Sequence, residues 1–129
     1  MKTKIWSCLV FHKLLYLKRM DDCIFCKIVK KEVPTKYLYE SKNLIVIPDI
    51  NPAADVHILI IPKEHISTFV DIKKEHKDLI LEMVEVAQKF IKEKGVEKKY
   101  KMIFNGGSFQ LVPHLHWHLV GGDFRKEAV

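Results

Sequence analysis

Apolar and polar positions repeat with two different periods along the chain, and these periods predict its elements. Short runs rich in branched and aromatic apolar residues, bounded by turn residues or proline, predict β-strands. These runs occupy residues 36–39, 44–47, 56–61, 100–104 and 114–120. Apolar residues three and four apart, with Lys and Glu between them, predict a long amphipathic helix over residues 71–94. A shorter pattern of this kind predicts a helix over residues 21–31, which Pro34 stops.

The long helix has recognisable ends and a broad apolar surface. Asp71 is a suitable N-cap, and Gly95 is a suitable C-terminal stop. The apolar stripe consists of Ile72, Leu79, Ile80, Met83, Ala87, Phe90 and Ile91. Val84 and Val86 add apolar surface beside this stripe, which suggests a second packed face such as a contact between subunits.

The order of the elements predicts an α+β fold. A short helix, three strands, a long helix and two strands follow one another without repeated alternation of strand and helix. The first two strands are expected to form a hairpin, because residues 40–43 are a polar turn cluster and Pro48 closes the second strand. We therefore expect a mainly antiparallel five-stranded sheet with one short N-terminal helix and one long helix. At 129 residues with 48% hydrophobic content, the chain fits a single domain with a substantial core.

Most of the net charge lies outside the expected domain. The formal net charge is +6, and residues 1–19 contribute five basic residues and no acidic one. Residues 20–129 are nearly neutral and contain one arginine, Arg125, so a nucleic-acid partner is not expected. Residues 1–19 are interpreted as an extension in front of a natural start at Met20, with an amphipathic helix on a membrane surface as the alternative. No apolar run approaches the roughly 20 residues of a membrane span, and we expect a cytoplasmic protein.

Three histidines, His114, His116 and His118, occupy every second position of the last predicted strand. In an extended chain, side chains two positions apart point to the same face and lie about 7 Å from one another. One surface would therefore carry a row of groups that transfer protons, attack electrophiles or bind metal ions. A polar solvent-facing strand is the plainer alternative, although Lys, Thr and Glu are more usual there. For His57, the local pattern leaves open both a packed core residue and a functional one.

Residues 114–120 read HLHWHLV, and they resemble the His-φ-His-φ-His-φ-φ signature (φ, hydrophobic) of the histidine triad (HIT) family of nucleotide hydrolases and transferases. Other stretches similar to the family, in the same order, are residues 23–28, 49–52, 57–66, 105–107 and 121–122. The resemblance spans nearly all of residues 20–122. It implies a half-barrel-like antiparallel sheet, a homodimer in which the long helix takes part, and a nucleotide site on the histidine face.

The resemblance also implies roles for the histidines. His116 corresponds to the nucleophile, which attacks the α-phosphorus of a purine nucleoside 5′-phosphoramidate or related nucleotide and forms a nucleotidyl-histidine that water hydrolyses. A neutral imidazole suits this role, because it is a good nucleophile near pH 7 and a good leaving group from phosphorus. Its other ring nitrogen should be held by a main-chain carbonyl of its own strand. His57 and His118 correspond to flanking histidines that stabilise the phosphate charge.

The remaining nucleotide contacts are implied in the same way. Asp49 corresponds to the carboxylate that holds the ribose hydroxyls, and Asn105 to a phosphate contact. The apolar slot around the base corresponds to Ile24, Phe25, Ile28, Ile47 and Ile50. The loop before the triad departs from the family pattern, because Leu111 stands where similar members carry a hydroxyl that contacts the leaving group. Ser108 and Gln110 are the candidates to replace it.

Three cysteines are present, and Cys23 and Cys26 form a Cys-x-x-Cys pair. From the residues alone, this pair could serve as core residues, as a redox pair or as half of a zinc site. By resemblance to bacterial members of the family, Cys23, Cys26, His65 and His114 would bind a structural zinc ion. A closed site with four ligands has no open position for catalysis. No organic cofactor is expected.

Two other functions stay open at this stage. A dinucleoside polyphosphate hydrolase or a nucleotidyl transferase would use the same His116 chemistry on a larger substrate. A non-catalytic regulatory protein would bind a nucleotide without turnover. The sequence contains no visible Ser-His-Asp set, phosphate-binding P-loop or pair of catalytic carboxylates, so other enzyme classes have little support.

Overall fold

The strands form one antiparallel sheet. The computed structural model describes residues 22–125. Its strands are β1 (Tyr39–Glu40), β2 (Leu44–Pro48), β3 (Ala54–Pro62), β4 (Tyr100–Ile103) and β5 (Trp117–Phe124). They lie in the order β1-β2-β3-β5-β4, and each neighbouring pair is antiparallel. The last strand in the sequence therefore lies inside the sheet, between β3 and β4.

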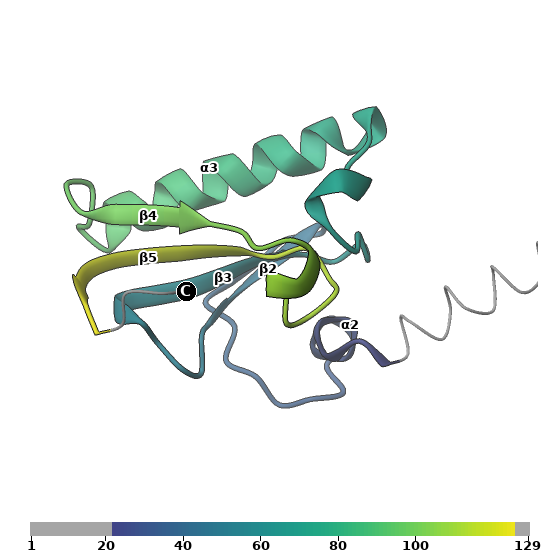
Figure 1. Cartoon of the computed structure of the whole chain (residues 1–129), viewed down its shortest axis with the longest axis horizontal. Helices are drawn as coiled ribbons and strands as arrows, with labels where there is room; N and C mark the ends of the chain where they lie inside the picture. The colour runs from purple at the N-terminus through teal and green to yellow at the C-terminus, as the bar shows by residue number, and fades with distance from the viewer. Residues whose placement is uncertain (1–21, 126–129) are drawn as a thin grey trace, which may run out of the picture.

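Within the described residues, two α-helices cover opposite faces of this sheet (Figure 1). The short helix α2 spans Ile24–Val29, and the long helix α3 spans Lys77–Glu93. The connections contain single turns of 3-10 helix, namely η1 (Phe69–Asp71), η2 (Lys74–His76) and η3 (Gly107–Phe109). The predicted α+β fold, with its five-stranded antiparallel sheet, short helix and long helix, is confirmed.

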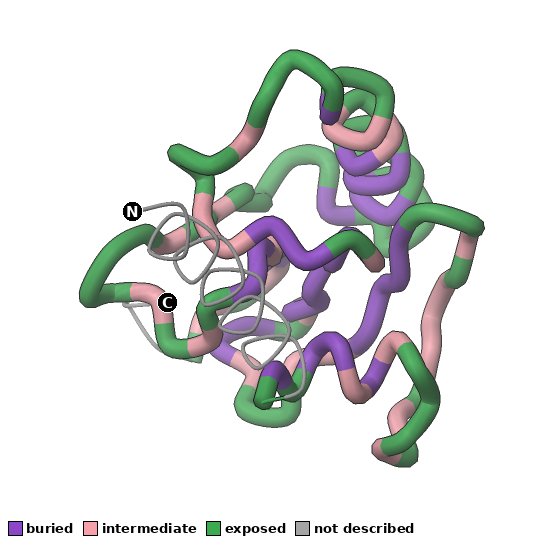
Figure 2. The backbone as a smooth tube through the Cα atoms, turned by 90° about the vertical axis from the view of Figure 1, so that its right-hand side faces the viewer, coloured by how far each residue is buried: buried purple, intermediate pink, exposed green. Residues whose placement is uncertain are grey.

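The central strands are buried on both faces, because their side chains alternate between the side of α2 and the side of α3. In β2, Leu44 and Val46 pack on the side of α3, whereas Ile45 and Ile47 pack on the side of α2. Figure 2 shows the buried positions gathered in the central strands and along one side of the long helix. The unbroken apolar runs of the sequence thus mark strands that are covered on both faces.

The long helix begins later than the sequence predicts. Asp71 caps the turn η1 rather than α3, since its Oδ2 accepts a 3.2 Å hydrogen bond from the backbone N–H of Thr68. α3 starts only after His76, whose Nδ1 accepts the backbone N–H of Lys73 at 2.9 Å. The predicted stop at Gly95 is confirmed, because this glycine follows the C-cap with a φ of +68°.

The apolar surface of α3 is divided between the core and the solvent. Val86, which the sequence placed on a second face, packs in the core of the chain itself. Val84 and Leu81 remain exposed, at 37% and 56%. Of the predicted pair, only Val84 is therefore left for a second face, and Leu81, which was not predicted, lies on the surface of the same helix.

The extension predicted over residues 1–19 lies outside the described residues. In the described part of the chain, no helix has the length and apolar character needed to cross a membrane. The first described residue, Asp22, lies just before the helix that carries the Cys-x-x-Cys pair.

Candidate functional site

The triad histidines lie where the chain enters β5. This strand begins at Trp117, so the predicted strand over residues 114–120 is wrong for its first three residues. A competing contact explains the difference: the backbone N–H of Leu115 donates to the carbonyl of Ile66 at 2.6 Å and does not join the ladder. His118 lies inside the strand and is paired on both sides. The three histidines therefore do not form one regular row.

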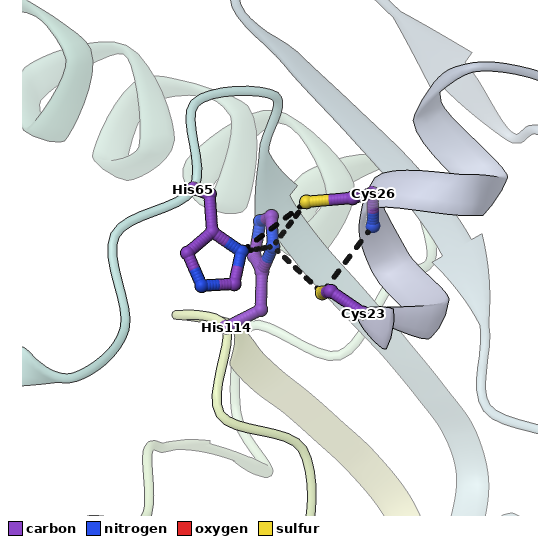
Figure 3. Close-up of side chains that lie close together, drawn as sticks. All are labelled: Cys23, Cys26, His65 and His114. Carbon is purple, nitrogen blue, oxygen red and sulfur yellow. Dashed lines mark hydrogen bonds between the residues drawn. The ribbon is translucent and has the colours of Figure 1, made fainter. Parts of the chain in front are cut away.

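Cys23, Cys26, His65 and His114 converge on one buried point (Figure 3). Sγ of Cys23 lies 3.3 Å from Nδ1 of His114, and Sγ of Cys26 lies 3.2 Å from Nδ1 of His65. The Nδ1 atoms of the two histidines are 3.1 Å apart. The four side chains come from the start of α2, the segment after β3 and the segment before β5. The structure thus brings together all four residues that the sequence assigned to a metal site.

We call Cys23, Cys26, His65 and His114 the cysteine–histidine cluster. The hydrogen bonds of this cluster are compatible with a bound metal ion. Nε2 of His114 donates to the carbonyl of Pro62 at 2.8 Å, so the lone pair of the neutral ring lies on Nδ1 and faces the cysteines. In a tetrahedral zinc site with two sulfur and two nitrogen ligands, the ligand atoms lie about 3.3–3.8 Å apart, close to the distances in the cluster. A cleft of about 540 Å³ reaches Cys23 and His65 and offers an entry path.

The pKa values show what a cation would change in this cluster. Burial, together with the neighbouring Cys23, raises the pKa of the Cys26 thiol to about 12. Burial likewise lowers the pKa of His114 to about 4. Cys26 and His114 are therefore neutral at pH 7, and a divalent cation would stabilise the thiolate form of the cysteines. The residues present fit zinc in ligand type, number and orientation.

His57, His118 and Asp49 form a second group, which we call the relay group. The backbone N–H of Ala53 donates to Nδ1 of His57 at 2.9 Å, so the proton of the neutral His57 ring lies on Nε2. This Nε2 lies 2.9 Å from Nδ1 of His118 and 3.2 Å from Oδ2 of Asp49. Because two protons cannot face each other at 2.9 Å, the proton of neutral His118 lies on its own Nε2. Each ring in the relay group therefore has a defined tautomer.

His116 lies between the cysteine–histidine cluster and the relay group. Its Nδ1–H donates to the carbonyl of His114 at 2.7 Å, as the sequence predicted, and this leaves the lone pair on Nε2. The ring centroid of His116 lies 5.1 Å from that of His118. Burial lowers the pKa of His116, and burial with the adjacent His116 and His57 lowers the pKa of His118 to about 4. Both rings are neutral at pH 7, and Nε2 of His116 is able to attack an electrophile.

Both groups have atoms that could hold a metal ion, and their hydrogen bonds distinguish them. In the cysteine–histidine cluster, the lone pair of His114 points toward the other ligands. In the relay group, the N–H of Ala53 keeps a proton on Nε2 of His57, and this ring would have to change tautomer to bind an ion. The first group is therefore suited to a metal, and the second to hydrogen bonding.

The residues predicted to surround the base are not all enclosed. Phe25, Ile28 and Ile47 are buried and belong to the apolar cluster under α2. Ile24 and Ile50 are exposed, at 41% and 101%. The structure thus brings the first three together and leaves the other two on the surface.

The polar residues predicted to contact the nucleotide lie in two loops, one after β2 and one between β4 and β5. Oδ1 of Asp49 accepts the backbone N–H of Asn51 at 2.8 Å, so this carboxylate is fixed in its turn as well as in the relay group. Asn105 is half-buried two residues after the end of β4, and Ser108 is exposed in η3. The Nε2 of Gln110 donates to two main-chain carbonyls, at 2.7 and 2.9 Å. Of the two candidates for the missing hydroxyl, Ser108 has the exposed side chain.

Two main-chain groups that orient the histidines were not foreseen from the sequence. They are the N–H of Ala53 and the carbonyl of Pro62. Side-chain patterns carry no information on such groups, because every residue has a main chain. The small side chain of Ala53 beside the loop at Asp49 was the available signal, since it lets the main chain approach His57.

Comparisons with known proteins identify the family of this chain. The family described as "Scavenger mRNA decapping enzyme C-term binding" matches residues 22–128. A purine nucleoside phosphoramidase of Escherichia coli K12 is 38% identical over 107 residues, which cover 79% of this chain and 88% of that protein. A 14 kDa zinc-binding protein of Zea mays is 38% identical over 112 residues, covering 82% of this chain and 88% of that one. The solved structure of a HIT family hydrolase from Clostridium thermocellum has a TM-score of 0.75 and is 42% identical in sequence. The match covers 84% of this chain and 96% of that chain.

The fold and the histidine site thus define a hydrolase with a histidine-centred site on an antiparallel sheet. The chain belongs to the histidine triad (HIT) family, as the sequence predicted.

Proposed function

We propose that this protein hydrolyses purine nucleoside 5′-phosphoramidates through a nucleotidyl intermediate on His116. The hydrogen bond from Nδ1–H of His116 to the carbonyl of His114 carries the proposal, because it leaves the nucleophilic lone pair on Nε2. The name of the E. coli relative, purine nucleoside phosphoramidase, supports this substrate class.

The reaction proceeds in two displacements at phosphorus. First, Nε2 of His116 bonds to the α-phosphorus while the P–N bond breaks, and the leaving amine takes a proton from the solvent. Water then attacks phosphorus, the bond to Nε2 breaks, and the nucleoside monophosphate is released. Over both steps one water molecule is consumed: its oxygen goes to phosphorus, one of its protons replaces the proton that the solvent gave to the amine, and the other dissociates from the monophosphate product. The Nε2–H of His118, with His57 behind it, stabilises the charge that grows on the phosphoryl oxygens.

The nucleotide would lie against the α2 face of the sheet. Phe25, Ile28 and Ile47 offer the buried apolar surface for the base. Asp49 holds the ribose hydroxyls, and Asn105 or Ser108 contacts the phosphate side. These assignments rest on the resemblance to the family together with the positions described above.

Cys23, Cys26, His65 and His114 would hold a structural zinc ion, which ties α2 to the segments before and after the central strands. The name of the Zea mays relative, a zinc-binding protein, supports this metal. When bound, the ion stabilises the cysteine thiolates, and a closed site with four ligands takes no direct part in the chemical steps. Two unpaired, buried cysteines also suit a reducing compartment, and we place the protein in the cytoplasm.

A dinucleoside polyphosphate is the less favoured substrate. Residues 102–124, which contain the loop before the triad and β5, include no Lys or Arg. This stretch therefore lacks the cations that usually neutralise a polyphosphate leaving group. A neutral amine leaving group needs no cation to neutralise it.

The protein is also proposed to act as a homodimer. β4 is the last strand of the sheet order, so one of its edges is unpaired within the described residues. Exposed apolar side chains lie on this strand and on α3, namely Tyr100, Met102, Leu81 and Val84. An unpaired edge flanked by apolar residues suits pairing with a second copy of the chain.

Replacement of the nucleophile tests the proposed activity. His116→Asn is expected to lower turnover of an adenosine phosphoramidate by about a thousandfold or more while leaving thermal unfolding unchanged. An alkaline quench of the native enzyme during turnover should show protein with the mass of one added nucleotide, and the variant should not. Full turnover by His116→Asn would exclude the mechanism. Faster hydrolysis of diadenosine tetraphosphate than of the phosphoramidate would favour the alternative substrate, and AMP binding without turnover of either compound would favour a regulatory role.

A further inference from the structure

His116 lies in a segment that the sheet does not hold. The segment before β5 is fixed instead by the chain after β3: Nε2 of His114 bonds the carbonyl of Pro62 at 2.8 Å, and the N–H of Leu115 bonds the carbonyl of Ile66 at 2.6 Å. The ring of His114 also lies against that of His65, with a centroid distance of 4.8 Å. The position of the nucleophile therefore depends on the residues around the cysteine–histidine cluster.

Two contacts lead from this cluster to His116. The first is His114 itself, because its side chain belongs to the cluster and its carbonyl accepts the Nδ1–H of His116 at 2.7 Å. The second is Phe25, which lies between Cys23 and Cys26 in the sequence. The Phe25 ring meets the ring of His116 edge to face, at 5.0 Å and 71°, and the ring of His114 at 5.8 Å and 89°.

These contacts leave the nucleophile little freedom once the cluster is ordered. Phe25 is 6% exposed and lies in the first turn of α2, whose N-cap is Cys23, so the ring moves only if the start of α2 moves. A cation that draws the four ligands together would fix the start of α2 and the segment before β5 at once. A purely structural ion would hold α2 in place without affecting His116.

We propose that metal binding in the cysteine–histidine cluster positions His116, and that Phe25 is the positioning residue between the start of α2 and the His116 ring. This inference rests on the proposed function, since it takes His116 as the nucleophile. Metal binding and nucleotide binding are then coupled, and the coupling must be reciprocal: each increases the affinity for the other by the same factor.

Cobalt(II) tests the coupling without measuring turnover, because the absorption bands of a cobalt thiolate site respond to its geometry. The full-length chain is loaded with cobalt and titrated with AMP. We expect AMP to change the cobalt bands and to tighten cobalt binding about fivefold or more. In Phe25→Leu these changes should shrink, whereas Phe69→Leu, which alters an aromatic residue stacked on Phe104, should retain them. Unchanged bands and unchanged cobalt affinity at saturating AMP would overturn the coupling.

Kinetics of the zinc-loaded enzyme separate positioning from base contact. Phe25→Leu should lower kcat for an adenosine phosphoramidate by about tenfold, because the ring of His116 is less well oriented. A variant with a raised KM and an unchanged kcat would show that Phe25 only contacts the base, and would overturn its positioning role. If native protein binds AMP but hydrolyses no phosphoramidate, the proposed function fails, and the cobalt titration still decides the coupling.

Discussion

Nε2 of His57 lies 2.9 Å from Nδ1 of His118, and the N–H of Ala53 on the far side of His57 sets the direction of the hydrogen bond between them. Replacing His57 by Ala removes the donor that holds His118 in its tautomer. We expect kcat for an adenosine phosphoramidate to fall by about a hundredfold. His57→Gln keeps an N–H donor and should lose less. Equal activity of the Ala and Gln variants in a steady-state assay would show that this donor has no role.

Acid should destabilise the protein through His118. Burial and the adjacent His116 and His57 lower its pKa in the folded state to about 4, whereas the unfolded chain has the ordinary value of 6.5. Between these values the unfolded state binds more protons, so the free energy of unfolding decreases as the pH falls from 6.5 to 4 and levels off below 4. The contribution of this residue is up to about 3 kcal/mol.

Urea unfolding at a series of pH values checks this prediction. His118→Asn should show a smaller decrease of the free energy of unfolding between pH 6.5 and 4 than the native protein. Loss of metal at low pH affects both proteins equally, so the difference between them reports His118. Parallel curves would contradict the predicted pKa.

Removal of one cysteine should abolish metal binding and lower stability. Cys26→Ala leaves three of the four ligands, and we expect well under one zinc per chain in elemental analysis of protein prepared without a His-tag. The free energy of unfolding should fall by about 3 kcal/mol or more, because the native state loses a tightly bound ligand. Cys8→Ala, which removes the third cysteine of the chain, is the control. A full zinc complement in Cys26→Ala would show that the ion binds elsewhere.

A hydroxyl introduced at position 111 should increase kcat/KM for a substrate with an amine leaving group. Leu111 is 93% exposed in the loop before the triad, so the replacement Leu111→Ser disturbs no core packing. If the new hydroxyl bonds the departing amine, kcat/KM should rise about threefold to tenfold, the effect of one added hydrogen bond. Val70→Ser, at another exposed apolar position, should leave kcat/KM unchanged. No rise in Leu111→Ser would indicate that Ser108 already fills this role.

Charge on the apolar edge should separate the subunits. Met102 of β4 is 36% exposed and Leu81 of α3 is 56% exposed, and a lysine at both positions would place charges inside the proposed contact. We expect light scattering to give the mass of a dimer for the native chain and of a monomer for the double variant. A native chain that is monomeric at micromolar concentration would exclude the proposed dimer.

The fold was predictable because its elements carry strong local patterns. The strand at residues 56–61 is a short apolar run between turn residues, and α3 shows a clear helical period. The boundaries failed where tertiary contacts compete with local preference. Asp71 caps a short 3-10 turn rather than the helix, and the chain at His114 turns toward the cluster before it joins the sheet.

The site was predictable at the level of side chains and not at the level of protons. The resemblance to the family indicated the four metal ligands, and the structure places those four residues together. The pairing of His57 with His118, by contrast, depends on strands brought together by the fold. The tautomers depend on main-chain groups at Ala53 and Pro62, which no pattern of residue types reveals.

The hydrogen bond from the N–H of Ala53 also limits how this site can change during evolution. Ala53 is buried, so only a small residue fits at this position, but any small residue with an N–H would keep the proton order of the two histidines. Proline is the exception, since it has no N–H to donate. A single substitution of Ala53 by proline would therefore inactivate the site while every catalytic side chain remained in the sequence. Inspection of those side chains would not reveal the loss of activity.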